Sequence, residues 1–412
     1  MKSLAAVDCP HKGKSMHRYL EYILTKVVCW KRKKAIPHGS GKGFLVLIRY
    51  PLGDTMTVLP LLRELKRSFP ATEITAVCAP SNKNLLAASP CIDRLLVYDD
   101  RAQKSYCRVN LRRTWDFARE YLWQTDIGAA IVPTTCMPSM VDAWLAFFSG
   151  ASRRFSYTER TNKTNHRQYM GAYDALFTKI LEAHGEAHEV ERNLMLVSAA
   201  GGSVADTGMP VWLTEEDERC VDDLLAAANL PLDTRRVIVN LSTSHPSKDW
   251  PVERYVSVCR TLSARYPLSL LLVGAGKSAE KYAKTFCREV SAYNFIGRTT
   301  IRQTLALMKR ADFYLGGDTG PAHFAAACGL RGVVIYKVGA DIQNMEQNYP
   351  VRLYPWQSDL TMLQPENVLP GCEQGCLHTV PHCILQVTEE QVLRAMQDSI
   401  GIADKMKSVR LT

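Results

Sequence analysis

The sequence predicts an α/β protein with two domains, each built on a doubly wound parallel sheet, and three observations support this prediction. The chain has 412 residues, which is long for one domain and sufficient for two that each bury a core. From Gly43 onward, short apolar runs alternate with amphipathic segments, the pattern of βα units in a parallel sheet. The alternation pauses at residues 200–213, where Gly, Ala and Ser are abundant, as is typical of an interdomain linker.

Each domain is predicted to be Rossmann-like, because strands and helices alternate along it. For the first domain, 43–200, the expected strands are 44–49, 73–78, 95–98, 128–133 and 152–156. Its expected helices lie near 55–68, 111–123, 138–149 and 173–199. After a linker at 201–213, the second domain, 214–387, is predicted to begin with a helix near 214–229 and to contain strands 236–241, 268–273, 293–296, 313–316 and 332–336. A last helix, 388–406, lies in the C-terminal segment 388–412 and could pack back on the first domain.

Most of the positive charge lies in an N-terminal extension, residues 1–42. It holds ten Lys and Arg against two Asp and Glu, so eight of the ten net positive charges lie there. An amphipathic helix with a basic end is predicted over residues 15–34, because apolar residues recur at three- and four-residue spacing. These are Met16, Tyr19, Leu20, Ile23, Val27 and Trp30. Two interpretations stay open: the helix lies on an anionic membrane surface, or its apolar stripe packs on the body of the protein. We expect no nucleic-acid partner, because no recognition motif accompanies the charge.

The rest of the composition favours a cytoplasmic protein. No stretch approaches the roughly 20 apolar residues of a spanning helix, and residues 1–15 contain no secretory h-region. The thirteen cysteines are odd in number and ten are scattered singly, which indicates reduced thiols in a reducing compartment. We therefore expect a cytoplasmic location, peripheral on the inner face of the cytoplasmic membrane if the N-terminal helix binds lipid.

The first candidate site residue follows the first predicted strand, at the end of the sheet where ligands bind in open parallel sheets. There the sequence makes a tight turn, with Gly53 and Asp54 directly at the start of a helix. Asp54 is either an N-cap that accepts backbone N–H bonds or a general base for a hydroxyl bound between the domains. Gly53 would allow a substrate to approach closely.

Two loops of the second domain carry groups that suit a diphosphate. The loop after its first strand contains Thr243, Ser244 and Lys248, whose hydroxyls and ammonium group can bind phosphate. The loop after its fourth strand leads into a helix N-terminus, which offers free N–H groups and a positive dipole end. It reads Gly316-Gly317-Asp318-Thr319-Gly320-Pro321-Ala322-His323. Because both loops leave the same edge of one sheet, we expect them to converge on one diphosphate. His323 is either a further donor or a packed core histidine.

Several other kinds of site are not predicted. The sequence contains no Walker A motif, no G-x-S-x-G and no H-E-x-x-H, and Gly274-Ala275-Gly276 is too short for a dinucleotide fingerprint. It contains no Asp-x-Asp, the usual holder of a metal–nucleotide-sugar complex. We therefore expect chemistry without metal or cofactor, in which Lys248 and helix N-termini neutralise a leaving diphosphate.

In combination, these residues resemble glycosyltransferase family 9, the ADP-heptose:lipopolysaccharide heptosyltransferases. The resemblance covers about residues 43–400 and rests on three motifs in order: Gly53-Asp54, Ser247-Lys248-x-Trp250-Pro251 and Asp318-Thr319-Gly320-Pro321-x-His323. It implies a GT-B fold, two Rossmann-like domains facing a central cleft. It also implies an inverting transfer of heptose from an ADP-sugar to the inner core of lipopolysaccharide, with this nucleotide-diphosphate sugar and a glycolipid acceptor as partners.

The resemblance also assigns roles by position. Asp54 would be the general base, and Lys248 would hold the diphosphate. The other expected donor-binding residues are Thr243, Ser244, Arg298, Thr299, Thr300, Asp318, Thr319, Gly320 and His323, of which Arg298 to Thr300 would lie near the nucleotide base.

Alternatives stay open for the substrates and the reaction. The N-terminal extension and the region 101–170 match no part of the family pattern, so another nucleotide sugar or acceptor is an alternative. A nucleotide-sugar epimerase or hydrolase would need further acid–base groups, for which the candidates by type are Glu182, His184, Glu186 and His188. A non-catalytic binding protein is disfavoured, because both Asp54 and Lys248 are present.

A last cluster consists of Cys372, Cys376 and Cys383, with His378 and His382 between them. Thiols and imidazoles are ligands of Zn²⁺, but this spacing is not a standard one for structural zinc. We therefore predict structural thiols and no metal, with zinc and a disulfide as the alternatives.

Overall fold

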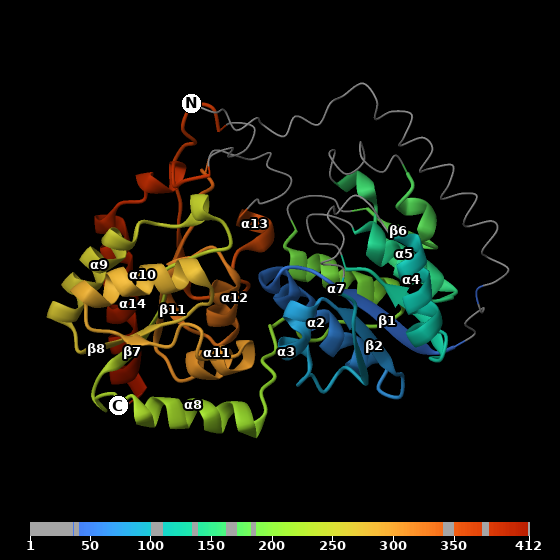
Figure 1. The fold of residues 1–412 in the computed structure, drawn as a ribbon, viewed down its shortest axis with the longest axis horizontal. Coiled ribbons are helices and arrows are strands. Elements are labelled where there is room, and N and C mark those ends of the chain that lie inside the picture. Colours follow the sequence, from blue (N-terminus) through green and yellow to red (C-terminus); the bar gives the residue numbers. More distant parts are fainter. Residues whose placement is uncertain are drawn as a thin grey trace.

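The computed structural model describes residues 36, 41–99, 110–133, 139–161, 171–182, 187–340, 350–372 and 379–410. The predicted helix at 15–34 lies outside these residues, as do His184, Glu186, Cys376 and His378. Two six-stranded parallel sheets form two domains that lie side by side (Figure 1). The prediction of two doubly wound α/β domains is confirmed.

The sheet of the first domain has the strand order β3-β2-β1-β4-β5-β6. Its strands are β1 (Gly43–Ile48), β2 (Ile74–Cys78), β3 (Arg94–Val97), β4 (Ile127–Ile131), β5 (Arg153–Tyr157) and β6 (Lys179–Leu181). Its α-helices are α2 (Leu52–Ser68), α3 (Lys83–Leu86), α4 (Leu111–Phe117), which continues as a π-helical turn (Ala118–Leu122), α5 (Met140–Phe148) and α7 (Glu189–Ala199). Alternate residues of β1 face opposite sides: Val46 packs with α2 and α7, and Leu47 packs with α5. Both faces are covered, which explains why β1 is apolar throughout.

The sheet of the second domain has the order β12-β11-β10-β7-β8-β9. Its strands are β7 (Arg235–Asn240), β8 (Leu268–Leu272), β9 (Tyr293–Asn294), β10 (Phe313–Gly317), β11 (Arg331–Ile335) and β12 (Leu360–Leu363). Its α-helices are α8 (Glu215–Ala227), α9 (Val252–Arg265), α10 (Lys277–Glu289), α11 (Ile301–Met308), α12 (Gly320–Ala327), α13 (Pro350–Leu353) and α14 (Glu389–Arg410). Chain order reverses between β7 and β10, and ligands bind at such switch points beyond the carboxyl ends of the strands.

The predicted helix at 173–199 is wrong in its first half. That stretch contains a 3₁₀ turn (Asp174–Leu176) and the edge strand β6, and α7 begins only at Glu189. His188 sets this start as the N-cap, because its ring accepts a hydrogen bond from the Val190 amide (3.1 Å) while Glu191 accepts one from the His188 amide (2.9 Å). The edge strand β12 was also not predicted.

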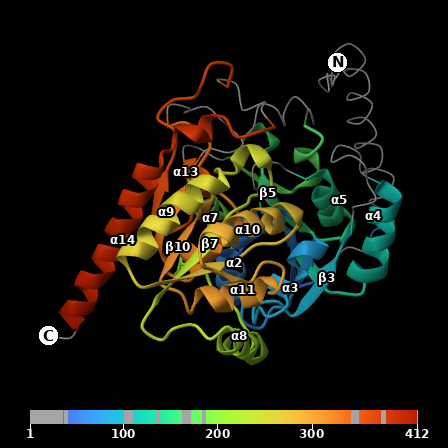
Figure 2. The same cartoon turned by 60° about the vertical axis from the view of Figure 1, so that its left-hand side comes forward.

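The C-terminal helix α14 packs on the second domain, and not on the first, which the sequence had left as a possibility. Its buried residues Val392, Met396 and Ile400 share a core cluster with residues of α9 and β7. Figure 2 shows α14 running along the outer side of this domain. The reason is that the apolar stripe of α14 packs beside α9 on the same face of the second sheet, over β10, β11 and β12.

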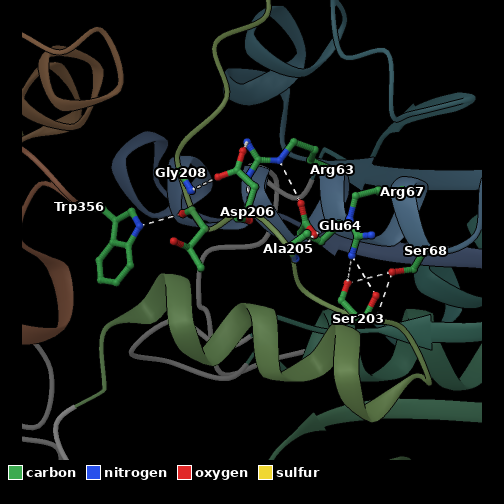
Figure 3. Close-up of polar contacts among 10 residues, drawn as sticks. Arg63, Glu64, Arg67, Ser68, Ser203, Ala205, Asp206, Gly208 and Trp356 are labelled. Atoms are coloured by element: carbon green, nitrogen blue, oxygen red, sulfur yellow. Dashed lines mark hydrogen bonds and ion pairs between the residues drawn. The ribbon is translucent and has the colours of Figure 1, made fainter.

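The linker between the domains, residues 201–213, is hydrogen-bonded to side chains of α2 (Figure 3). The buried carboxylate of Glu64 accepts hydrogen bonds from Arg67 Nε (2.8 Å) and from the Ala205 amide (2.8 Å). Ser68 Oγ accepts one from the Ser203 amide (3.0 Å). At the other side, Trp356 Nε1 donates to the Thr207 carbonyl (2.8 Å). The start of the linker is therefore held to the first domain, and its middle is held by a residue just before β12 of the second sheet.

Candidate active site

The two domains touch where the β1–α2 and β10–α12 loops meet. A Cβ atom added at Gly53 would lie 3.0 Å from Cδ2 and 3.3 Å from Nε2 of His323. One added at Gly320 would lie 3.5 Å from Cδ2 of Leu52. The absence of a side chain at Gly53 therefore lets the first turn of α2 approach the first turn of α12. Asp54, the next residue, lies at this boundary.

Asp54 is not an N-cap. The helix begins at Leu52 with Pro51 in the capping position, so Asp54 is the third residue of α2. Within the described part of the chain, its carboxylate accepts no hydrogen bond. The N-cap interpretation of Asp54 is therefore wrong, because Asp54 neither holds the capping position nor bonds with a backbone N–H group.

The environment of Asp54 suits a general base. Burial raises the pKa of its carboxyl from 3.8 to about 7, and the negative charges of Glu189 and Asp318 add to this effect. Lys248 and Arg352 lower the pKa in part. A carboxylate with a pKa near 7 is a far stronger base than an ordinary aspartate, and it is still partly deprotonated at neutral pH.

Lys248 and Asp318 lie together, as predicted from the convergence of their loops. Lys248 Nζ donates to Asp318 Oδ2 at 2.8 Å, and their side chains are 19% and 22% exposed. Lys248 ends a 3₁₀ turn (Pro246–Lys248) after β7, and Asp318 directly follows β10, the neighbouring strand. The ammonium group is accessible to an anion that would compete with Asp318 for it.

The loop that carries Lys248 is held by its own polar side chains. Asp249 Oδ1 accepts a hydrogen bond from the Thr243 amide (2.7 Å), and Thr243 Oγ1 donates to the His245 carbonyl (3.0 Å). A Cβ atom at Gly317 would lie 2.8 Å from Cγ2 of Thr243, so glycine is needed at the end of β10. Ser244 is exposed at the tip of this loop.

A second cation near Lys248 was not predicted. Lys337 Nζ donates to Ser247 Oγ at 3.1 Å, which brings its charge to the residue beside Lys248. Lys337 comes two residues after β11. The rule that led to Lys248, a cation just beyond the carboxyl end of a strand, would have found it.

His323 lies on the first turn of α12, as expected. It has features of both interpretations, a packed core histidine and a residue with a polar atom free for a ligand. Its side chain is packed, with 5% of the residue exposed, yet Nδ1 is buried without a hydrogen-bond partner among the described residues. Burial lowers the pKa of the imidazole, although Asp318 raises it in part. His323 is therefore neutral near pH 7. Thr319 is the N-cap residue of the same helix, but its hydroxyl makes no hydrogen bond that caps the helix.

The loop Arg298-Thr299-Thr300 follows β9 at the same end of the sheet. Thr300 caps α11, where its side chain accepts a hydrogen bond from the Gln303 amide (3.2 Å). Thr299 Oγ1 bonds with Thr304 Oγ1 (2.9 Å). Arg298 is exposed, with its guanidinium 5.8 Å from the Phe295 ring centroid. The two threonines thus have structural roles in this loop, and Arg298 presents the accessible polar group.

A buried ion pair beside Asp54 was also missed. Glu189, the first residue of α7, is fully buried, and Arg352 Nε donates to its Oε1 at 2.9 Å. Burial raises the pKa of Glu189, while Arg352 lowers it. Among the acid–base candidates nearby, His188 is structural: its ring stacks on Trp356 (4.5 Å between centroids) and bonds with the Tyr354 carbonyl (2.9 Å). Glu182 is exposed.

Two six-stranded parallel-sheet domains that meet at the β1–α2 and β10–α12 loops, and the likeness to solved structures of this kind, show the GT-B fold of glycosyltransferases. The chain belongs to glycosyltransferase family 9 (heptosyltransferase), whose family model matches residues 135–360. The resemblance seen in the sequence is thereby confirmed.

The chain is also similar to individual relatives and to solved structures. The lipopolysaccharide core heptosyltransferase OpsX of Haemophilus influenzae is 18% identical over 298 residues, which cover 72% of this chain and 79% of the relative. A solved glycosyl transferase family 9 structure from Veillonella parvula matches with a TM-score of 0.69 at 18% identity, covering 88% of this chain and 98% of that one. The Escherichia coli heptosyltransferase WaaC, solved with ADP-2-deoxy-2-fluoro heptose, matches with a TM-score of 0.63 at 15% identity, covering 86% and 99%. In the part of the chain that the structure describes, no helix is long and apolar enough to span a membrane.

Proposed function

We propose that the protein transfers heptose from ADP-heptose to a hydroxyl of the lipopolysaccharide inner core, with inversion at the anomeric carbon and without a divalent metal. The observation that carries this proposal is the position of Asp54. It lies at the domain boundary with a raised pKa, and both Lys248 and Asp318 contribute to its electrostatic environment. A base on one domain thus faces a phosphate ligand on the other.

The proposed reaction is a single displacement. The acceptor oxygen forms a bond to the anomeric carbon, its proton passes to an Oδ atom of Asp54, and the bond from that carbon to the diphosphate breaks. The electron pair of the broken bond leaves with ADP. Lys248 offsets the charge of the diphosphate, and Lys337 and the N-terminus of α12 add to the positive potential. These groups support a metal-independent mechanism, because they can replace the usual cation.

The choice of donor is supported by the relatives. WaaC has been solved with an ADP-heptose analogue, and OpsX is named for the lipopolysaccharide core. We extend the proposal to the membrane: the basic segment 15–34 would keep the enzyme near a glycolipid acceptor.

A panel of ADP-, GDP-, UDP- and CMP-linked sugars tests the donor. A true donor stabilises the folded protein by mass action, so ADP-heptose should raise the melting temperature in a concentration-dependent way and give transfer to a lipopolysaccharide-core acceptor. The anomeric configuration of the product should be opposite to that of the donor. Stabilisation by another nucleotide sugar alone, a retained configuration, or a rate lost with EDTA and restored by Mg²⁺ or Mn²⁺ would each contradict the corresponding part of the proposal.

A further inference from the structure

A second group of reactive side chains is formed by Cys372, His382 and Cys383. One donor atom from each lies within 4.8 Å of the other two. His382 Nδ1 is 3.5 Å from Cys372 Sγ and 3.6 Å from Cys383 Sγ. Both cysteines are buried and His382 is half-buried. The residues come from both sides of segment 373–378, so it is the fold of this region that brings their donor atoms together.

We propose that these three side chains bind a Zn²⁺ ion. Zinc bonds are about 2.3 Å to sulfur and about 2.0–2.1 Å to imidazole nitrogen, and structural sites are tetrahedral. In that geometry a sulfur and a nitrogen on the same ion are about 3.6 Å apart. The two sulfur–nitrogen distances around His382 match this separation. Two thiolates and an imidazole form a ligand set that selects zinc over hard cations.

The ion would stabilise the chain segment that is hydrogen-bonded to Trp250 and Arg254, just after the loop that carries Lys248. The Leu369 amide donates to Cys383 Sγ (3.5 Å), which joins the chain before the cluster to the chain after it. Beyond Cys383, the Val387 carbonyl accepts a hydrogen bond from Trp250 Nε1 (2.9 Å), and the Leu385 carbonyl accepts one from Arg254 (2.8 Å). Trp250 is almost fully buried two residues after Lys248. The proposed role is structural, because the chain beyond the cluster is hydrogen-bonded to Trp250 and Arg254.

Metal content tests the proposal on the full chain, purified without a histidine tag. Elemental mass spectrometry should find about one zinc per chain, and a chelator that removes it should lower the melting temperature, with Zn²⁺ restoring it. Protein reloaded with Co²⁺ should show thiolate-to-cobalt charge-transfer absorption. Cys372→Ser, Cys383→Ser and His382→Gln should each lose most of the zinc. The matched control is Cys287→Ser, an exposed thiol on α10 that should leave the zinc content unchanged.

Several results would overturn the proposal. Iron in place of zinc, a metal-free protein, or zinc retained by all three ligand variants would do so. So would a Cys372–Cys383 disulfide, seen as a cross-linked peptide and a mass lower by two hydrogens. If the buried cysteine variants fail to fold, the half-buried His382→Gln variant and the cobalt spectrum of the wild type decide the question.

Discussion

Glu189 and Arg352 form an ion pair between the two domains: the carboxylate begins α7 in the first domain, and the guanidinium belongs to α13, between β11 and β12 of the second sheet. Their charges act on Asp54 in opposite directions, since Glu189 raises its pKa and Arg352 lowers it. The pair therefore links the contact between the domains to the basicity of the proposed catalytic carboxylate.

Glu189→Gln should shift the acid limb of kcat/KM to lower pH. The substitution removes a negative charge that raises the pKa of Asp54 and leaves the opposing charge of Arg352 in place. We expect a shift of about half a pH unit or more, measured as a pH–rate profile from about pH 5 to pH 9. Glu216→Gln, an exposed acid on α8, is the matched control and should not move the profile. An acid limb that stays in place in Glu189→Gln would exclude this role for the ion pair.

Gly53→Ala should lower activity and stability, because the new methyl group would meet the buried ring of His323 at 3.0 Å. The ring has little room to move, so the first turns of α2 and α12 must separate. We expect a loss of about 1–3 kcal/mol, from denaturant unfolding. Gly401→Ala is the control: a Cβ atom there meets nothing within 4 Å, and it lies inside α14. It should stabilise the protein by about 1 kcal/mol through helix propensity. Equal effects of the two substitutions would contradict the close contact at Gly53.

Lys248→Ala should weaken ADP binding by about tenfold or more and also slow transfer, because the diphosphate is charged before the reaction and more so as it leaves. Lys337→Ala should have a smaller effect of the same kind, since its ammonium is held one residue away by Ser247. The control is Lys309→Ala on the surface, where the lysine contacts Glu218 at 3.4 Å. Calorimetric titration with ADP measures all three. Unchanged ADP affinity in Lys248→Ala would show that another group holds the diphosphate.

Asp54→Asn should raise the melting temperature at pH 8. The folded-state pKa of Asp54 is about 7, above the ordinary value of 3.8, so the folded protein binds this proton more tightly than the unfolded chain does. The wild type therefore loses stability as the pH rises from about 4 to 7, and asparagine avoids this loss. We expect the variant to melt at least about 2 °C higher at pH 8, with a difference that disappears near pH 4. A variant that is less stable at pH 8 would contradict the raised pKa.

The main features of the site could be predicted because they depend on a local rule. Asp54, Lys248 and Asp318 each follow a buried parallel strand, and such strands bring their carboxyl ends to one edge of a sheet. Glu189 and Arg352 could not be predicted, since their meeting depends on how two domains pack.

The errors in the predicted secondary structure and packing also occur where the result depends on contacts between distant parts of the chain. The strand β6 has three residues and lies at a sheet edge, so it has no periodicity that separates it from a helix. The amphipathic stripe of α14 predicted a packed helix but carried no information on which domain would receive it. The spacing of the cysteines alone did not indicate that the His382 ring lies near both Cys372 and Cys383, because this arrangement depends on the fold of the segment.

The central claim, that Asp54 is the general base, is tested most directly by the single-turnover rate of Asp54→Asn with saturating ADP-heptose and acceptor. A positioned base is typically worth about 10²–10⁴-fold, and asparagine keeps the size of the side chain while removing its basicity. We predict a rate lower by at least about 100-fold, with ADP affinity within about twofold of wild type and no fall in melting temperature. A rate within about threefold of wild type would contradict the account, and the base would then have to be another group.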